Sequence, residues 1–555
     1  MASENDGEMS GDSMCKILKE EGLGKWDETF RKMSVIKLRE LNDGVLTEMG
    51  IDPLEDRQKI LDSILKIWPA AHKVFNDPIH GHMELHPVLV KIIDMPQFQR
   101  LRYIKQLGAG YFVYPGASHN RFEHSIGVGH LAGELVKALK EKQPDLNIND
   151  RDILCVQIAG LCHDLGHGPF SHLFDQMFIP KATRPSGSLG EKMRTWKHED
   201  ASEEMFDHLV ESNGYLPGMM EAYGLKLSED LDFIKEMIKL PEAKKKYKGR
   251  PEEKSFLYEI VANKRNGIDV DKFDYFARDC HHLGIKNNFD HGRFIKFARV
   301  CDVDEQKGDG QKVKGQKHIC TRDKEGNNLY DLFHTRYSLH RRAYQHNVVK
   351  IIEHMITEAF LKADQHIQIK GSGGEMFTLS TAIADMEAYT KLTDCVFYKI
   401  LNSTEDTLQK AREILKNIVD RKHYRFLGEI KHKGTPTKDE IPQLKEELAA
   451  ALPFPRQGVQ ADGLTKEDFV VLSATMDYGS GAEDPINSVD FYSKKNPNQT
   501  FKITRKEVSK LLPVQFSETL FRVYGKKMDS KSLDAARGHF EQLNPVWSDS
   551  HVTEP

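Results

Sequence analysis

The sequence predicts a mainly α protein with a small helical bundle near the N-terminus, a large all-α core and a smaller α+β lobe near the C-terminus. Apolar residues recur at helical spacing through most of the 555 residues, whereas strand-like segments gather after about residue 468. At roughly 150 residues per domain, this length corresponds to three or four domains. The histidines mark one boundary, because none occurs in residues 1–71 and 20 of the 25 lie between His72 and His354.

Composition excludes several classes of protein. The formal net charge of −5 is inconsistent with a uniformly basic nucleic-acid coat protein. We expect no membrane association, because no run of 18 apolar residues occurs, and no secretory signal, because the first residues are polar and acidic. The seven cysteines are scattered without a CxxC motif, which predicts buried thiols in a reducing compartment rather than a zinc ribbon. Pairing of Cys301 with Cys320 under oxidation stays an open alternative.

The elements are predicted in this order. Residues 1–12 are expected to be disordered, and residues 13–68 to form the bundle, with a closing helix entered through Pro53. Residues 73–430 form the core, with helices over 131–142 and 151–162 and a long helix starting near Leu329. Residues 180–197 are predicted to be a loop, and residues 302–318 a mobile hairpin or loop. Residues 431–540 form the lobe, entered through a polar linker, with strands over 468–479 and 501–508, and residues 541–555 form a loose tail.

The strongest motif is Gly160-Leu161-Cys162-His163-Asp164-Leu165-Gly166-His167-Gly168, where an apolar helix runs into a His-Asp pair. A buried aspartate requires a partner, and a divalent metal would bind both side chains. His124 and Asp271 supply the two further ligand types. The order His…His-Asp…Asp resembles the HD superfamily of metal-dependent phosphohydrolases, although a His–Asp hydrogen bond that only stabilises the core is the alternative. Two histidines and two carboxylates accommodate iron, manganese or zinc.

The residues after this motif suggest proton transfer. A metal ion of this kind lowers the pKa of its water to roughly 7, so no protein nucleophile is required. The leaving oxygen still needs a proton. His172 is the predicted general acid, and His167, Asp175 and His198 are predicted to support it.

Helical spacing also predicts a phosphate-binding set. Asp271, Tyr275 and Asp279 share one helix face, and Arg336 shares another with Tyr344. Three cations could converge on phosphates beside the metal, with surface salt bridges as the alternative; they are Arg121, Lys272 and Arg336.

Longer segments carry a closer resemblance. Residues 75–82, 98–108, 263–272, 277–284 and 339–346 (FNDPIHGH, FQRLRYIKQLG, NKRNGIDVDK, ARDCHHLG and LHRRAYQH) are similar to the vertebrate SAM-and-HD-domain deoxynucleoside triphosphate triphosphohydrolases, a family of antiviral restriction factors. The similarity runs from about Lys73 to Ala536. Before it, about 55 residues resemble a SAM domain, a five-helix interaction bundle.

The resemblance implies hydrolysis of deoxynucleoside triphosphates (dNTPs) to deoxynucleoside and inorganic triphosphate, which would lower dNTP pools and restrict viral replication. It places the metal on His124, His163, Asp164 and Asp271, and the triphosphate on the three cations with Mg²⁺. Gln106 and Asp279 would hold the sugar 3′-hydroxyl, and Leu107 and Tyr344 would crowd the 2′ position. Tyr275 and Gln345 would complete the pocket.

The resemblance further implies a homotetramer activated by GTP or dGTP and by dNTPs. The matching first-site positions are Lys73, Val74, Asp94, Gln99, Arg102 and Arg421. The second-site positions are Asn76, Val113, Asp290, Arg293, Arg322, Lys324, Asn328, His346 and Lys494. Asn347 stands where the family usually has lysine, and residues 302–318 are longer than expected, so activation could differ.

Two alternative functions are weighed against this one. The first is another HD-type nucleotide phosphohydrolase, such as a nucleotidase or a cyclic-nucleotide phosphodiesterase. The second is a SAM-scaffolded nucleic-acid-binding protein, which would leave the ligand set unexplained. Single-stranded nucleic acid is kept as a candidate partner. The expected location is the nucleus, with the cytoplasm as the alternative, and the sequence does not specify the SAM module's partner.

Overall fold

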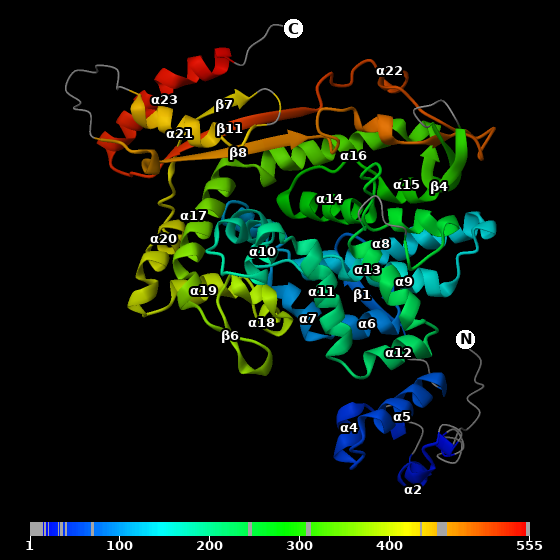
Figure 1. Cartoon of the computed structure of the whole chain (residues 1–555). Coiled ribbons are helices and arrows are strands. Elements are labelled where there is room, and N and C mark those ends of the chain that lie inside the picture. The colour runs from blue at the N-terminus through cyan, green and yellow to red at the C-terminus, as the bar shows by residue number, and fades with distance from the viewer. Residues whose placement is uncertain are drawn as a thin grey trace.

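The computed structural model describes residues 22–31, 41–67, 72–241, 247–306, 312–432, 436–451 and 463–550, and a few isolated positions. The predicted disordered segment 1–12 lies outside these residues. Figure 1 shows the N-terminal bundle and the C-terminal lobe at opposite ends of the molecule, with the helical core between them. The mainly α fold predicted from the sequence is confirmed.

The N-terminal bundle includes the helices α2 (Asp27–Arg31), α4 (Asp43–Glu48) and α5 (Leu54–Ile67). The apolar residues Leu18, Phe30, Leu38 and Leu46 are buried together in it. Gln58 of α5 donates a hydrogen bond to the Tyr215 carbonyl, 3.1 Å away. The bundle therefore contacts the core at Tyr215, which directly precedes helix α12 (Leu216–Ala222).

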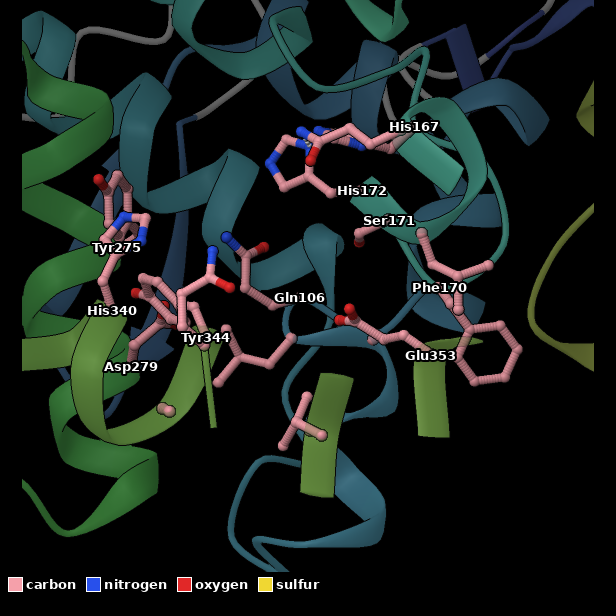
Figure 2. A pocket seen from close by; sticks show the side chains of 18 of the residues that line it. Gln106, His167, Phe170, Ser171, His172, Tyr275, Asp279, His340, Tyr344 and Glu353 are labelled. Carbon is pink, nitrogen blue, oxygen red and sulfur yellow. Dashed lines mark hydrogen bonds between the residues drawn. The ribbon is translucent and has the colours of Figure 1, made fainter. Parts of the chain in front are cut away.

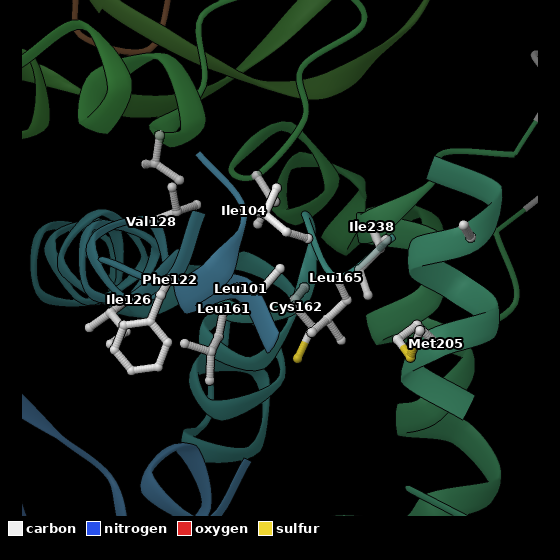
Figure 3. Packing of buried hydrophobic residues seen from close by; sticks show 14 of the residues in the cluster. Leu101, Ile104, Phe122, Ile126, Val128, Leu161, Cys162, Leu165, Met205 and Ile238 are labelled. Atoms are coloured by element: carbon white, nitrogen blue, oxygen red, sulfur yellow. The ribbon is translucent and has the colours of Figure 1, made fainter. Parts of the chain in front are cut away.

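The centre of the core is a pair of largely buried helices, α8 (Arg121–Lys142) and α9 (Asp150–Cys162). Glycines bring them close together, since a Cβ on Gly160 would lie 3.1 Å from the Ala132 Cβ. Figure 3 shows Phe122, Ile126 and Val128 of α8 near Leu161 and Cys162 of α9. Helix α14 (Val270–Leu283) packs against α8.

Further helices surround this centre. They are α6 (Pro87–Ile93), α7 (Pro96–Gln99), α10 (Ser188–Thr195), α11 (His198–Glu211), α13 (Leu227–Ile238), α15 (His291–Phe297), α16 (Gly326–Leu339), α17 (Asn347–Ala363), α18 (Met386–Thr390), α19 (Cys395–Leu401) and α20 (Gln409–Val419). Helix α10 lies inside the predicted loop 180–197. Two π-helical turns, Phe174–Phe178 and His340–Tyr344, interrupt the regular helices.

The core also contains strands, which corrects the all-α expectation for this part. Strands β1 (Lys73–Asp77) and β2 (Gly81–Leu85) form an antiparallel hairpin, as do β3 (Arg299–Gln306) and β4 (Lys312–Arg322). The segment predicted as a mobile hairpin or loop is thus largely a hairpin. β4 pairs with β9 (Phe491–Tyr492), which pairs with β10 (Thr500–Phe501), and β5 (Ile369–Lys370) pairs with β6 (Met376–Phe377).

The lobe is an antiparallel sheet of order β7-β11-β8, formed by β7 (Arg425–His432), β8 (Phe469–Asp477) and β11 (Ser517–Gly525). Helices α21 (Glu440–Ala450) and α23 (Ser530–Ser550) cover one face (Figure 1). On the other face, Val470 and Tyr524 contact Ile351 of α17.

Three expectations for the lobe need correction. Strand β7 crosses the predicted boundary at 430/431, because this strand pairs with β11 rather than with the core. Residues 501–508 hold the end of β10 and the short helix α22 (Arg505–Val508) rather than one strand. The predicted tail is helical as far as Ser550, since α23 packs Ala536 and Phe540 against the sheet. Across the described residues, we find no helix that combines the length and the apolar character needed to span a bilayer.

Candidate active site

The predicted metal ligands meet where three helices converge. His124 lies in the first turn of α8, His163 directly follows α9, and Asp271 lies in the first turn of α14. The Nε2 atoms of His124 and His163 are 3.2 and 3.3 Å from Asp271 Oδ1. Each also lies 3.4 Å from a carboxylate oxygen of Asp164. Residues that are far apart in the sequence thus form one cluster of two imidazoles and two carboxylates.

This cluster fits a metal ion. Both Nε2 atoms are buried and have no hydrogen-bond partner among the described residues, whereas both Nδ1 atoms are engaged. His124 Nδ1 is 2.7 Å from Asp274 Oδ2, and His163 Nδ1 is 2.8 Å from the Gly160 carbonyl. Ligand atoms that are each about 2.0–2.2 Å from one zinc-like ion lie roughly 3.3–3.6 Å apart in a tetrahedron. The spacing of both histidine nitrogens from Asp271 Oδ1 therefore matches a shared cation, whereas Asp164 presents a different carboxylate oxygen to each histidine.

The four predicted proton-transfer residues form a second cluster beside the first. The rings of His167 and His198 stack with centroids 4.0 Å apart, and His172 lies 5.0 Å from His167. His198 Nδ1 is 3.0 Å from Asp175 Oδ2, and His172 Nδ1 is 3.5 Å from Asp175 Oδ1. Gly166 permits this arrangement, because a Cβ there would lie 2.2 Å from the His198 carbonyl oxygen.

The electrostatics of this cluster distinguish its members. Burial disfavours the charged forms of both Asp175 and His198. The His172 and His198 imidazoles outweigh it at Asp175, and the Asp175 carboxylate outweighs it at His198. The pKa of Asp175 is therefore held well below its usual range, and that of His198 is raised. Nearby, burial and the Arg336 charge lower the pKa of His340 to about 3, so this imidazole is neutral. The His172 side chain is 52% exposed, which leaves it accessible to a leaving group.

A cavity of about 390 Å³ opens beside both clusters. Figure 2 shows Gln106 between the Asp279–Tyr344 side and the His167–His172 side of this pocket in that view. The predicted pocket residues that line it are Gln106, Leu107, Arg121, Tyr275, Asp279, Arg336, Tyr344 and Gln345. Asp164, Asp271, His167, His172 and His198 also reach its wall.

The three predicted phosphate cations are placed differently. Arg121 is buried and donates to Asp164 Oδ2 at 2.6 Å and to Ser171 Oγ at 3.0 Å. Arg336 reaches the cavity but also donates to the Asp477 carbonyl at 2.7 Å. Lys272 pairs with Asp269 at 3.2 Å, outside the described lining of the cavity. Two of the three predicted cations thus face the pocket, and Lys272 is not among the residues that line it.

The opposite wall carries a polar group of sugar-binding type. Tyr344 donates its hydroxyl proton to Asp279, and His119 Nε2 lies 2.6 Å from the other oxygen of that carboxylate. Burial raises the pKa of the Tyr275 and Tyr344 hydroxyls well above the usual value, so both stay protonated. The wall therefore offers neutral donors and one carboxylate acceptor.

The predicted first-site activator positions lie outside this cavity. Lys73 and Val74 are on β1, Asp94 ends α6, and Arg102 Nε donates to Gln99 Oε1 at 2.8 Å. Arg421 follows α20 with a positive φ of 59°. They therefore sit on several separate elements.

The second-site positions are only partly gathered. The Asp290 N–H donates to Asn328 Oδ1 at 2.9 Å, and Arg293 pairs with Glu325 at 2.7 Å. Lys324 and Arg322 lie 4.0 and 6.0 Å from the centre of the Phe297 ring. Elsewhere, Asn76 is on β1, Val113 follows a 3₁₀ turn, His346 caps α17 and Lys494 follows β9.

Sequence reasoning missed several carboxylates and one histidine at the site. Asp274 carries a usable signal, since it lies three residues after Asp271 on the same helix. Asp394, which accepts from the Lys105 and Phe170 backbone N–H groups at 2.9 and 2.6 Å, carries none, because its partners are more than 200 residues away. His119 and Asp477 carry none either, because their partners Asp279 and Arg336 are 160 and 141 residues away.

Known proteins resemble this chain closely. A family model described as the HD domain matches residues 121–279. The chain is 56% identical to the deoxynucleoside triphosphate triphosphohydrolase SAMHD1 of Danio rerio, over 97% of this chain and 85% of that protein. It is also 56% identical to the Homo sapiens protein of the same name, over 93% and 80%. The SAMHD1 homolog of Dictyostelium discoideum is 39% identical over 82% and 77%. The chain therefore belongs to the SAMHD1 family of HD-domain deoxynucleoside triphosphate triphosphohydrolases.

Proposed function

We propose that the chain hydrolyses dNTPs at the α-phosphorus and releases a deoxynucleoside and inorganic triphosphate. Its enzyme class, a dNTP triphosphohydrolase, follows from its family. The observation that carries the proposed site is that one cavity joins the metal-ligand cluster, a histidine–aspartate acid cluster and the Asp279–Tyr344 wall. Such a cavity can hold a triphosphate at one end and a deoxyribose at the other.

The protein groups divide the chemistry as follows. Iron, manganese or zinc on His124, His163, Asp164 and Asp271 would supply a hydroxide-like nucleophile and polarise a phosphoryl oxygen. Arg121, fixed by Asp164 and Ser171, presents positive charge to the phosphates without losing side-chain freedom on binding.

The bond between the α-phosphorus and the sugar O5′ breaks, and O5′ needs a proton as it leaves. His172 lines the cavity and its Nδ1 lies near Asp175, so its Nε2 is the donor that we assign to this step. His198 keeps Asp175 ionised and in place. The water oxygen stays on the triphosphate, and the deoxynucleoside keeps its own O5′.

Substrate selection would come from the sugar wall. Asp279 accepts from Tyr344 and lies against His119, so its carboxylate is held in one orientation toward the 3′-hydroxyl. Tyr344 and Leu107 leave little room for a 2′-hydroxyl, which favours deoxyribose over ribose.

Regulation belongs to the same proposal. We propose that GTP or dGTP, dNTPs and Mg²⁺ assemble a homotetramer, because the predicted activator residues lie outside the cavity in separate groups that a neighbouring subunit could complete. Asn347 and the β3–β4 hairpin would modify this activation. Lowered dNTP pools, restriction of viral replication, a nuclear location and single-stranded nucleic acid as a further partner stay predictions from the resemblance.

One assay tests the proposal. The protein is incubated with dATP and Mg²⁺, with and without GTP, and the products are separated by chromatography. We expect deoxyadenosine and intact triphosphate, with GTP required for turnover, and no product from Asp164→Ala, whose fold should persist by circular dichroism. Stepwise release of dADP and phosphate would contradict the proposal.

A further inference from the structure

One buried carboxylate behind the metal-ligand cluster makes four contacts. Asp274 is fully buried, and its Oδ2 lies 2.7 Å from His124 Nδ1 and 2.9 Å from Arg278 Nε. Its Oδ1 lies 2.7 Å from His80 Nε2 and 2.8 Å from Arg278 Nη2. Both carboxylate oxygens are therefore saturated, so the side chain has a single orientation.

The network continues to the β1–β2 hairpin. Arg278, also fully buried, donates its third bond from Nη1 to Asp77 Oδ2 at 2.9 Å. Asp77 Oδ1 accepts the Ile79 and His80 backbone N–H groups, both at 2.9 Å, which closes the turn of the hairpin. A continuous chain of charged contacts thus runs from a metal ligand on α8, through α14, to the hairpin tip.

A glycine makes room for this network. Gly127 lies three residues after His124 on α8, and a Cβ there would be 1.9 Å from Asp274 Oδ1 and 2.7 Å from Arg278 Nη2. The first distance is far below any real contact, so Asp274 could not stay where it is beside an alanine. The absence of a side chain at this position is therefore a requirement of the network.

We propose that Asp274 is the positioning residue that holds His124 as a metal ligand, and that Arg278 and Asp77 make this hold depend on the β1–β2 hairpin. A carboxylate on Nδ1 fixes the tautomer whose Nε2 is free to bind a cation, and it raises the basicity of that nitrogen. His124 Nε2 is a buried atom that faces Asp164 and Asp271, and no described residue gives it a hydrogen bond.

The hairpin matters because it supplies both Asp77 and His80. Loss of the Asp77 contact removes a partner of Arg278, and loss of the His80 contact removes a partner of Asp274. In either case the Asp274 carboxylate is free to turn away from His124. The position of the β1–β2 hairpin thus affects how tightly the His124 cluster binds a metal ion, although the hairpin contributes no metal ligand. This inference deepens the proposed metal centre, but it does not depend on the substrate, because the test reads metal binding directly.

The test uses Co²⁺ as the probe with the full chain, stripped of metal. Co²⁺ affinity is measured from visible absorption in competition with a chelator, and folding is checked by thermal unfolding without metal. We expect Asp274→Asn and Gly127→Ala to weaken Co²⁺ binding by roughly 10- to 100-fold. Asp77→Asn should weaken it by a smaller but measurable factor.

Gly538→Ala is the matched control for the glycine variant, since it lies in α23 with nothing within 4 Å of the added Cβ, and it should leave Co²⁺ binding unchanged. Unchanged affinity in folded Asp274→Asn or Gly127→Ala would overturn the positioning role. Unchanged affinity in Asp77→Asn would overturn the coupling to the hairpin, even if Asp274→Asn does not fold. Retained binding in His163→Ala would instead overturn the metal centre and, with it, the proposed function.

Discussion

Asp175 of the acid cluster and the buried Asp394 nearby show how the partner of a residue decides its chemistry. Asp175 faces two imidazoles, and its pKa is held well below the usual range despite burial. Asp394 faces two backbone N–H groups, and burial raises its pKa to about 7. The first stays ionised as a partner for His172 and His198, whereas the second changes charge near neutral pH.

Asp175→Asn should impair the acid cluster and leave the metal centre intact. The amide cannot hold a proton on His198, so we expect the pKa of His198 to fall. Because the predicted acid His172 also loses its carboxylate partner, kcat should fall by roughly 100-fold. NMR titration of His198, kcat and Co²⁺ affinity are the measurements. Unchanged kcat, or a large loss of Co²⁺ affinity, would contradict separate roles for the two clusters.

Asp394 should make the protein less stable as the pH rises, which is the opposite of the usual effect of an ion-paired carboxylate. Its folded pKa of about 7 exceeds the unfolded value of 3.8, so its contribution is complete below pH 3.8 and is lost as the pH rises through 7. At about 1.4 kcal/mol per pH unit, the total is on the order of 4 kcal/mol. Denaturant unfolding of the unaltered chain and Asp394→Ala should differ by an amount that shrinks from pH 4.5 to pH 8. A difference that grows with pH would refute this.

At the residue scale, the structure brings together the predicted metal ligands and most of the predicted pocket residues, whose order and spacing lie within recognisable motifs. His163-Asp164 and the α14 residues Asp271, Tyr275 and Asp279 could be read in this way. Lys272 could not be placed from its neighbours, since it pairs with Asp269, three residues earlier, and is not among the residues that line the cavity. Asp394 and His119 are defined only by tertiary contacts.

At the scale of elements, the break between α16 and α17 shapes the pocket. The long apolar pattern from Leu329 predicts one helix, but a π-helical turn at His340–Tyr344 widens it where Tyr344 reaches Asp279. Helical periodicity carries no signal for such a turn. Strand ends were also beyond prediction where pairing decides them, as in β7, which joins the lobe rather than the core.

The end of β8 supplies a prediction at this scale. Asp477 holds Arg336, so the lobe positions one of the two predicted phosphate-binding cations that face the cavity. Asp477→Asn should leave Arg336 less ordered and raise the KM for dATP several-fold, with Co²⁺ affinity unchanged. Steady-state kinetics measure the effect, and Glu483→Gln, on a nearby exposed residue, is the control. An equal KM in both variants would show that Arg336 needs no such support.

In the whole molecule, the active site is built within the core, away from the bundle. The bundle contacts the core through α5 and α12, and the lobe reaches the pocket through Asp477. The order of the three parts could be predicted because their composition differs. Their contacts could not, since Gln58 and Tyr215 are 157 residues apart.

The central claim for the whole molecule is that water attacks the α-phosphorus beside the His124–His163–Asp164–Asp271 cluster. Hydrolysis of dATP in H₂¹⁸O, followed by mass spectrometry of the products, tests it most directly. We predict one ¹⁸O atom in the inorganic triphosphate and none in deoxyadenosine. Label in the 5′-hydroxyl of deoxyadenosine, or in released monophosphate, would contradict the account.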